Sequence, residues 1–434
     1  MKEGRRSRDN EVLRSFGVYP AYKDSGVQWL QKIPAHWQLW KLSWLIDCLD
    51  GRRIPLNAEE RGRMQGDYPY WGANSIVDHV DRWLFDEELV LLGEDGAPFF
   101  DRAKSVAFRV SGKIWVNNHA HVLRPRGAIN ATFLTYVLNS VDYRAFIDGS
   151  TRDKLTQGDM NAIPIQLPSE SEQGAIGSFL DRETARINAL ISNKEQLIDL
   201  LQERRTALIS RAVTKGLDAR VPMKATHVEW VEQIPAHWEM EENRWLFQES
   251  NLRSNRGEEE LLTVSHITGV TRRSEKPEVS MIEAESHEGY KVCRADDLAI
   301  NTMWAWMGAL GVAREHGMVS PSYNVFRFAN GKLLPRYYDY LCRIPLHVAE
   351  IVRHSKGIWQ SRLRLYPDAF RELSTPIPPR REQEDIAAFL DRETVKIDVL
   401  IERVRDAISS LNELRATLVS AAVTGKIDVR EEVT

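Results

Sequence analysis

The chain has 434 residues, of which 43% are hydrophobic and 28% are charged, and its formal net charge is −4. This length predicts two or three domains, and the composition is that of a soluble globular protein. The three cysteines are scattered and exclude a disulfide framework or a CxxC metal site, so we expect a cytoplasmic protein. The negative net charge argues mildly against a naked nucleic-acid binder, unless positive charge gathers on one face.

The N-terminal segment, residues 1–26, is basic, but no apolar run follows it as a signal peptide would require. It leads into GVQWLQKIPAHW at 26–37, which recurs as HVEWVEQIPAHW at 227–238 with 7 of 12 residues identical. Such a repeat indicates a duplicated scaffold. The proline predicts a rigid extended backbone and the tryptophan a packed anchor. We therefore expect His36 and His237 to be structural rather than catalytic.

The first insert follows this block and alternates short strand-like runs with glycine-rich turns before it becomes helical over 131–147. This order predicts an α/β domain, to which we assign residues 27–167. The second insert, assigned to 219–378, has the same order and becomes helical over 336–354. Its apolar stretch at 298–313 is too short to span a bilayer and predicts a buried strand–turn–strand, so no membrane association is expected.

A long helical block follows each insert, within residues 168–218 and 379–434, and the two blocks share 21 of 46 aligned residues. Each helix is expected to begin after a proline-rich run, near Ser169 or Arg381, and Ser169-x-x-Glu172 has the form of a capping box. Gly216 and Gly425 end the two patterns. The period alone leaves open whether the FLDRET segment breaks each helix.

Apolar residues in the two blocks recur with the alternating three- and four-residue spacing of a coiled-coil seam. The expected seam consists of Ile187, Leu190, Leu197, Leu201 and Leu208 in the first helix and Ile397, Leu400, Val404, Leu411, Leu414 and Leu418 in the second. One interpretation is a plain helical hairpin that joins two domains. The other is a spacer of defined length, because 25 helical residues span about 37 Å and one turn of B-DNA is about 34–36 Å.

The two IPAHW blocks, the two FLDRET helices that end in AVTKG or AVTGK, and the two divergent inserts together resemble the specificity subunit of a type I restriction–modification system. The resemblance covers nearly the whole chain. It implies an α/β fold with two globular target-recognition domains, separated by two long antiparallel coiled-coil helices and related by an internal pseudo-twofold repeat. Each domain is then expected to read one half of a bipartite, asymmetric site in double-stranded DNA.

The resemblance also implies partners. Two modification (methyltransferase) subunits would bind the scaffold, and restriction (motor and nuclease) subunits would join them. S-adenosylmethionine, Mg and ATP are then expected on these partner subunits, and no cofactor is expected in this chain.

Both inserts end in a basic loop, at 149–160 and 356–370, rich in side chains that contact phosphates and base edges. The strongest candidates are Arg152, Lys154 and Gln157 in the first loop and Gln360, Ser361, Arg362 and Arg364 in the second. Weaker candidates are Tyr70, Trp71, Asn74, Asn117, Asn118 and His119 in the first insert and Trp304, Trp306, Ser322, Tyr323 and Asn324 in the second. For these weaker candidates the competing interpretation is a core tryptophan or a turn asparagine.

The sequence contains no glycine-rich phosphate loop, no HExxH motif and no metal-spaced Cys/His set, so we expect neither catalytic residues nor a metal site. His119 and His121 would share one face of a strand, but no third ligand is evident. Two alternatives stay open. One is a coiled-coil adaptor whose inserts bind proteins, and the other is a nuclease built around Glu94, Asp95 and His119.

Overall fold

The computed structural model describes residues 16–147, 153–275, 286–359 and 362–432. The chain forms two compact units, of which unit 1 comprises 1–195 together with 404–434 and unit 2 comprises 196–403. Two long helices, α6 (Glu170–Lys215) and α11 (Arg380–Val423), each contribute one part to either unit. No helix in the described part of the chain is long and apolar enough to cross a membrane.

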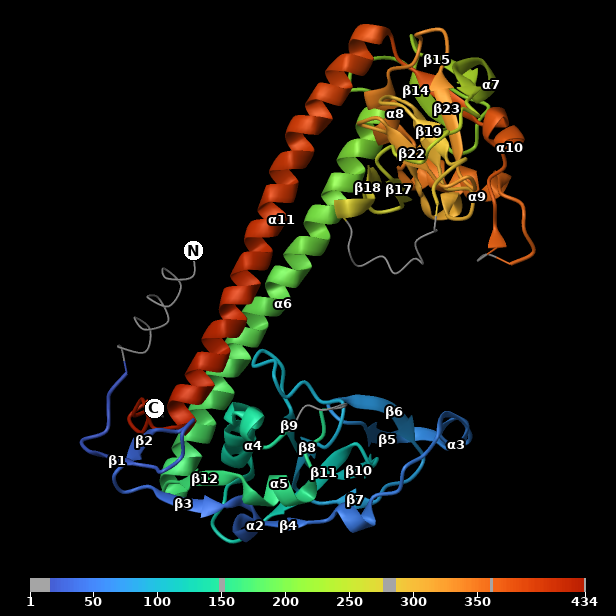
Figure 1. Ribbon diagram of the computed structural model, residues 1–434. Helices are drawn as coiled ribbons and strands as arrows, with labels where there is room; N and C mark the ends of the chain where they lie inside the picture. Colours follow the sequence, from blue (N-terminus) through green and yellow to red (C-terminus); the bar gives the residue numbers. More distant parts are fainter. Residues whose placement is uncertain (1–15, 148–152, 276–285, 360–361, 433–434) are drawn as a thin grey trace. The chain divides into compact units, whose positions relative to one another are not determined.

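Unit 1 is mixed α/β (Figure 1). Before α6 it contains β1 (Tyr22–Asp24), β2 (Lys32–Pro34), β3 (Gln38–Lys41), α2 (Leu42–Leu45), β4 (Ile46–Cys48), α3 (Ala58–Arg63), β5 (Gln65–Trp71), β6 (Ile76–Val80), β7 (Phe85–Asp86), β8 (Leu89–Gly93), β9 (Ala107–Val110), β10 (Lys113–Val116), β11 (Ala120–Pro125), α4 (Ala131–Ser140), α5 (Gln157–Ala162) and β12 (Pro164–Leu167). Eight of its strands form two four-stranded sheets, in the orders β4-β11-β8-β9 and β6-β5-β10-β7, and the pairs β1-β2 and β12-β3 form two-stranded sheets.

Strand β8 is buried on both faces, and its alternating side chains separate two cores. Val90 and Leu92 join the large cluster that contains α4 and the first turns of α6, whereas Leu89 and Leu91 join the cluster that includes Ile114 of β10. The helical stretch predicted over 131–147 is confirmed as α4 and a short 3-10 turn at Tyr143–Ala145.

Unit 2 is also mixed α/β and contains β13 (Met223–Ala225), β14 (Gln233–Pro235), β15 (Glu239–Glu242), α7 (Asn243–Leu246), β16 (Phe247–Glu249), β17 (Leu262–Ser265), β18 (Gly269–Arg272), β19 (Lys291–Cys293), β20 (Leu298–Ile300), β21 (Leu310–Val312), β22 (Gly317–Val319), β23 (Asn324–Phe328), α8 (Pro335–Leu341), α9 (Pro345–His354), α10 (Pro367–Glu372) and β24 (Ser374–Ile377). Its main sheet has the order β16-β23-β20-β21. The stretch 298–313 forms β20, a 3-10 turn and β21, which confirms the predicted strand–turn–strand.

The two IPAHW blocks make the same kind of contact, one in each unit. In unit 1 the Trp37 indole Nε1 donates to Glu172 Oε1 at 3.0 Å, and His36 Nε2 lies 3.0 Å from Glu172 Oε2. In unit 2, Trp238 Nε1 donates to Glu382 Oε2 at 3.0 Å, and His237 Nε2 lies 2.8 Å from the same oxygen. Each block therefore binds a glutamate in the first turn of a long helix, and the structural interpretation of both histidines is confirmed.

The same blocks also receive the end of the other long helix. Gly425, just after α11, lies against Pro34 and Trp37 in unit 1, and Gly216, just after α6, lies against Trp238 in unit 2. Both glycines have positive φ, +70° and +71°, which an L side chain rarely adopts. A Cβ on Gly425 would lie 2.4 Å from Pro34, so only glycine fits there.

The predicted starts of the long helices are confirmed to within a residue, and neither helix breaks at FLDRET. The predicted seam holds in part. Ile187, Leu201, Val404 and Leu418 are buried, and Leu208, Ile397, Leu411 and Leu414 are half-buried. Leu190, Leu197 and Leu400 are exposed, because an ordinary helix drifts about 20° per heptad away from a strict 3.5-residue seam.

Candidate nucleic-acid interface

The C-terminal end of the first basic loop contacts a cluster of charged side chains. Arg152 lies outside the described residues. Lys154 is exposed, but its Nζ lies 3.2 Å from Glu94 Oε1, and the next residue, Leu155, is buried and donates its backbone N–H to the Glu94 carbonyl at 2.8 Å. Gln157 is exposed at the first position of α5, directly after the N-cap Thr156. The loop is thus pinned at 154–155.

Buried charged side chains contact the anchored segment 154–155 and one another. His121 is 1% exposed, and its Nδ1 lies 2.6 Å from Asp50 Oδ2 while its Nε2 lies 2.9 Å from the Leu155 carbonyl, which can only accept. Burial raises the pKa of Asp50, but the hydrogen bond from His121 and the nearby charges outweigh burial and hold that pKa below its usual value. Arg53 Nη1 donates to Glu94 Oε2 at 2.6 Å.

Asp50, Glu94 and His121 bring three potential metal ligands within 4.8 Å of one another. His119, the other member of the predicted histidine pair, is not in this group, and Asp50 lies 71 residues from His121, a separation that no sequence motif marks. Arg53 and Lys154 already neutralise Glu94. Of the three residues named for the nuclease alternative, His119 and Asp95 are in contact, with Nδ1 2.5 Å from Oδ1, whereas Glu94 pairs with Arg53 and Lys154. This arrangement fits a charged clamp for the loop better than a metal site, because a cation would have to displace Arg53.

The weaker candidates of the first insert divide between core and rim. Tyr70 is 1% exposed and its hydroxyl accepts from the Leu56 N–H, so it belongs to the core. Asn117 is 8% exposed and accepts the His119 backbone N–H, as a turn residue does. Trp71 is half-buried against Phe108. Asn74 and Asn118 are exposed.

Parallel pairing explains why those two asparagines come together. β5 and β10 run parallel, with Trp71 opposite Val116, so the turns that follow both strands leave the same edge of the sheet. Asn74 and Asn118 lie in these two turns, and an isolated bridge between Asp95 and Lys154 brings the basic loop toward the same edge. We call Asn74, Asn118, Lys154 and Gln157 the unit 1 rim.

The second basic loop is a hairpin. Lys356 and Arg364 exchange both backbone hydrogen bonds, each at 3.0 Å. Gln360 and Ser361 lie outside the described residues. Arg362 is exposed and Arg364 half-buried, and in the described ranges no carboxylate pairs with either guanidinium.

An apolar pair in this hairpin was not among the sequence candidates. Ile358 is 93% exposed and Trp359 is 68% exposed. The signal was present in the sequence, since an isoleucine and a tryptophan stand between Lys356 and Arg362 in an otherwise polar loop. Proteins that bind the minor groove frequently insert apolar side chains such as isoleucine between base steps.

The other candidates of the second insert meet this hairpin at its base. The Leu365 N–H donates to the Thr302 carbonyl, and the Thr302 hydroxyl donates to the Ser322 carbonyl at 2.9 Å. Trp304 is 49% exposed and Ser322 is exposed. We call Trp304, Ser322, Trp359, Arg362 and Arg364 the unit 2 rim.

Three further candidates of the second insert are occupied by structural roles. Tyr323 and Asn324 are each 8% exposed. The Tyr323 hydroxyl accepts from Asn301 at 3.0 Å, and Asn324 donates to the Thr302 hydroxyl at 2.9 Å. Trp306 donates its indole N–H to the Met303 carbonyl. These side chains hold the loops next to the hairpin in place, and they do not form the exposed surface of the rim.

Comparisons with known proteins agree with these observations. Residues 34–200 match the family described as the type I restriction modification DNA specificity domain. A putative type I restriction enzyme specificity subunit of Haemophilus influenzae is 35% identical over 147 residues, which cover 34% of this chain and 37% of that protein. The EcoDI specificity subunit of Escherichia coli is 23% identical over 433 residues, covering 91% of this chain and 90% of that protein.

A solved chain described with the complex assembly and conformational transition of the type I R-M system shares the fold. Its TM-score is 0.56 at 16% identity, and the match covers 90% of this chain and 98% of that one.

Proposed function

We propose that this chain, whose residues 34–200 match the type I restriction modification DNA specificity domain, is the specificity subunit of a type I restriction–modification system and reads a bipartite, asymmetric site in double-stranded DNA. The unit 1 rim would read one half-site and the unit 2 rim the other. One observation carries the assignment of the rims. Leu155 and Leu365 stand at equivalent places in the two repeats, both are buried, and each anchors a basic loop by its backbone N–H.

The two rims differ in chemistry, which supports an asymmetric site. The unit 1 rim offers two exposed asparagine amides and one ion-paired lysine. The unit 2 rim offers two guanidiniums and two exposed indoles. Amides suit bidentate pairing with adenine, whereas guanidinium groups suit guanine or phosphate. Half-sites of different base composition would follow.

The long helices would act as the spacer between the half-sites and as the binding surface for two modification subunits, with the restriction subunits joining that assembly. We place S-adenosylmethionine, Mg and ATP on those partners and assign this chain no catalytic step of its own. Methyl transfer requires an exposed base, so flipping of the target base would be done by the modification subunit. We place the assembly in the cytoplasm, where its DNA is.

The direct test is genome-wide mapping of methylated bases in cells with and without this chain, with an active modification subunit present in both. Loss of one split, asymmetric motif on deletion is the expected result and would reveal both half-sites at once. An unchanged methylome in the presence of an active modification subunit would refute the proposal and favour the adaptor alternative. DNA cleavage by the purified chain with a divalent metal alone would favour the nuclease alternative.

A further inference from the structure

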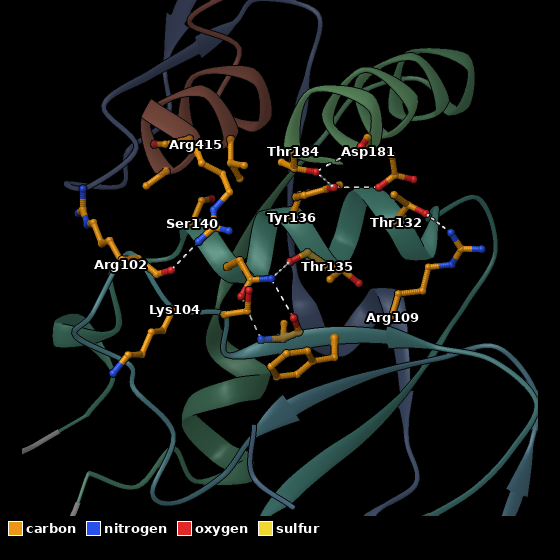
Figure 2. Close-up of a pocket in the computed structure, with 18 of the residues that line it drawn as sticks. Arg102, Lys104, Arg109, Thr132, Thr135, Tyr136, Ser140, Asp181, Thr184 and Arg415 are labelled. Carbon is orange, nitrogen blue, oxygen red and sulfur yellow. Dashed lines mark hydrogen bonds between the residues drawn. The ribbon is translucent and has the colours of Figure 1, made fainter. Parts of the chain in front are cut away.

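Unit 1 contains a cavity of about 710 Å³ that belongs to neither rim. It lies where α4 and the loop 102–105 meet α6 and α11, and Figure 2 shows side chains from these elements around it. Its lining is rich in hydroxyl and amide groups and includes five cations, Arg102, Lys104, Arg109, Arg415 and Lys426, but one carboxylate, Asp181. That volume is within the range of about 300–1,000 Å³ typical of small-molecule sites.

Two of the five cations and the carboxylate are already occupied. Arg109 donates to Glu88 at 2.8 Å and to the Thr132 hydroxyl at 2.9 Å. Asp181 accepts from the Tyr136 hydroxyl at 2.8 Å. Lys104 lies 3.5 Å from Asp101, with both side chains largely exposed.

Arg415 of α11 is different, because all its partners are neutral. It donates to the Asn188 side-chain oxygen at 2.5 Å, to the Ala103 carbonyl at 2.8 Å and to the Asn412 side-chain oxygen at 3.0 Å. In the described part of the chain no carboxylate pairs with Arg415, Arg102 or Lys426. Figure 2 shows Arg415 reaching from its helix toward Ser140 and the loop that carries Arg102 and Lys104.

The internal repeat shows that an arginine at this position can be neutralised by a carboxylate on the other long helix. Arg205 and Asp398 occupy the aligned positions of Arg415 and Asn188, and in unit 2 they form an ion pair at 2.9 Å. Neighbouring contacts match as well, since Tyr340 donates to Asp391 in unit 2 as Tyr136 does to Asp181 in unit 1. The one change of aspartate to asparagine therefore leaves an arginine without a counter-charge beside the cavity.

We propose that this cavity binds the phosphate group of a nucleotide. Arg415 and Arg102 would supply the charge, since guanidinium groups match phosphate oxygens, and the nearby Thr417 hydroxyl would complete the contacts. Trp71 and Phe108, whose ring centroids are 5.5 Å apart, line the same cavity and offer a surface against which a base can stack. The phosphate comes from a free nucleotide or from a DNA strand, and in either case the contact in the cavity is made by residues outside both rims. The inference therefore goes beyond the proposed function.

The test recreates the ion pair of unit 2 in unit 1. In the full-length chain, Asn188→Asp places a carboxylate beside Arg415 without removing any packing. Asp398→Asn is the matched control, because it makes the reciprocal change in unit 2. Titration calorimetry would follow binding of inorganic pyrophosphate, adenosine monophosphate and a duplex carrying the methylated motif, with Arg102→Ala as a second variant.

We expect saturable binding that Asn188→Asp and Arg102→Ala each weaken by about tenfold or more and that Asp398→Asn leaves unchanged. Weaker binding of adenosine monophosphate or pyrophosphate alone assigns the cavity to a free nucleotide. Weaker binding of the duplex alone assigns it to the DNA strand. If all three probes bind Asn188→Asp as they bind the unmodified chain, or if none binds either form, the inference is overturned. Methylation of the split motif by the same variant reports separately on the proposed function.

Discussion

At the residue scale, one carboxylate in each unit joins an IPAHW block to a long helix. Glu172 is 4% exposed and accepts both the Trp37 indole and the His36 ring. Glu382 accepts the same pair of groups in unit 2, but its side chain is 27% exposed. Because water can replace a partner only where it has access, the two sites should differ in how much they lose when the carboxylate is removed.

We expect Glu172→Ala to lower the free energy of unfolding by about 1–3 kcal/mol, because it leaves a buried indole N–H without an acceptor. Glu382→Ala should lower it less. Chemical denaturation of the two variants would measure both changes, with the exposed Glu170→Ala as a control for loss of charge at the start of α6. Equal losses at Glu172 and Glu170 would contradict the argument.

A buried histidine gives unit 2 a pH-dependent stability. His347 is fully buried beside the Trp230 and Tyr338 rings, and burial lowers its pKa to about 4, partly offset by the Cys342 carbonyl. The unfolded chain therefore binds a proton near pH 6.5 that the folded chain accepts only near pH 4, so stability falls as pH drops through this window.

We expect this group to account for about 2–3 kcal/mol of the stability lost between pH 7.5 and pH 4.5. His347→Gln cannot take up the proton and should lose correspondingly less over the same range. Denaturation midpoints of both proteins at the two pH values measure the difference. If the two proteins lose stability in parallel, His347 does not cause the effect.

At the scale of secondary-structure elements, the hairpin at 356–364 carries candidate DNA contacts. Arg362 and Trp359 project from one hairpin, so they should contact the same half-site. Arg362→Ala should weaken DNA binding, and a base contact would also relax sequence preference in one half-site by about 1–3 kcal/mol. Uniform weakening across sequences would assign Arg362 to a phosphate. Binding assays on duplexes varied in each half-site separately would decide between them.

Lys154→Ala is the matched change in unit 1, and we expect a smaller effect there. Lys154 is paired with Glu94, so part of its charge is already neutralised before DNA arrives. The affected half-site should be the other one. If both substitutions altered the same half-site, the assignment of one rim to each half-site would be wrong.

The long helices were readable from the sequence because local chemistry marks their ends. Ser169 accepts the Glu172 N–H, and Gly216 and Gly425 need positive φ. Which face of each helix is buried was harder to predict, since Leu190 and Leu400 depend on what packs beside them. In the candidate site, Lys154 and Arg362 were identifiable by type. Tyr70 was misread because parallel pairing of β5 and β10 buries it, and a parallel pair leaves no turn signal in the sequence.

At the scale of the whole molecule, α6 and α11 are continuous over 46 and 44 residues. A continuous helix transmits an insertion as a fixed rise and rotation. Inserting one heptad into both helices should change the preferred gap between half-sites by about 10 Å, or roughly three base pairs, without changing either half-site sequence. Methylome mapping of the lengthened chain would measure the gap. A changed half-site sequence with an unchanged gap would refute the spacer role.

The closure of unit 1 also affects the order in which the chain folds during its synthesis. Unit 1 is the first to leave the ribosome, yet it needs the segment 404–434, where Gly425 meets Pro34 and Asp428 pairs with Gly17. Unit 2 is one uninterrupted stretch, 196–403, and can finish earlier. At about 5–20 residues per second, unit 1 waits on the order of 10–40 seconds for its last piece. During that interval Gly425 does not yet cover Pro34 and Trp37, so we expect a nascent unit 1 to be the part of this protein that depends most on a chaperone.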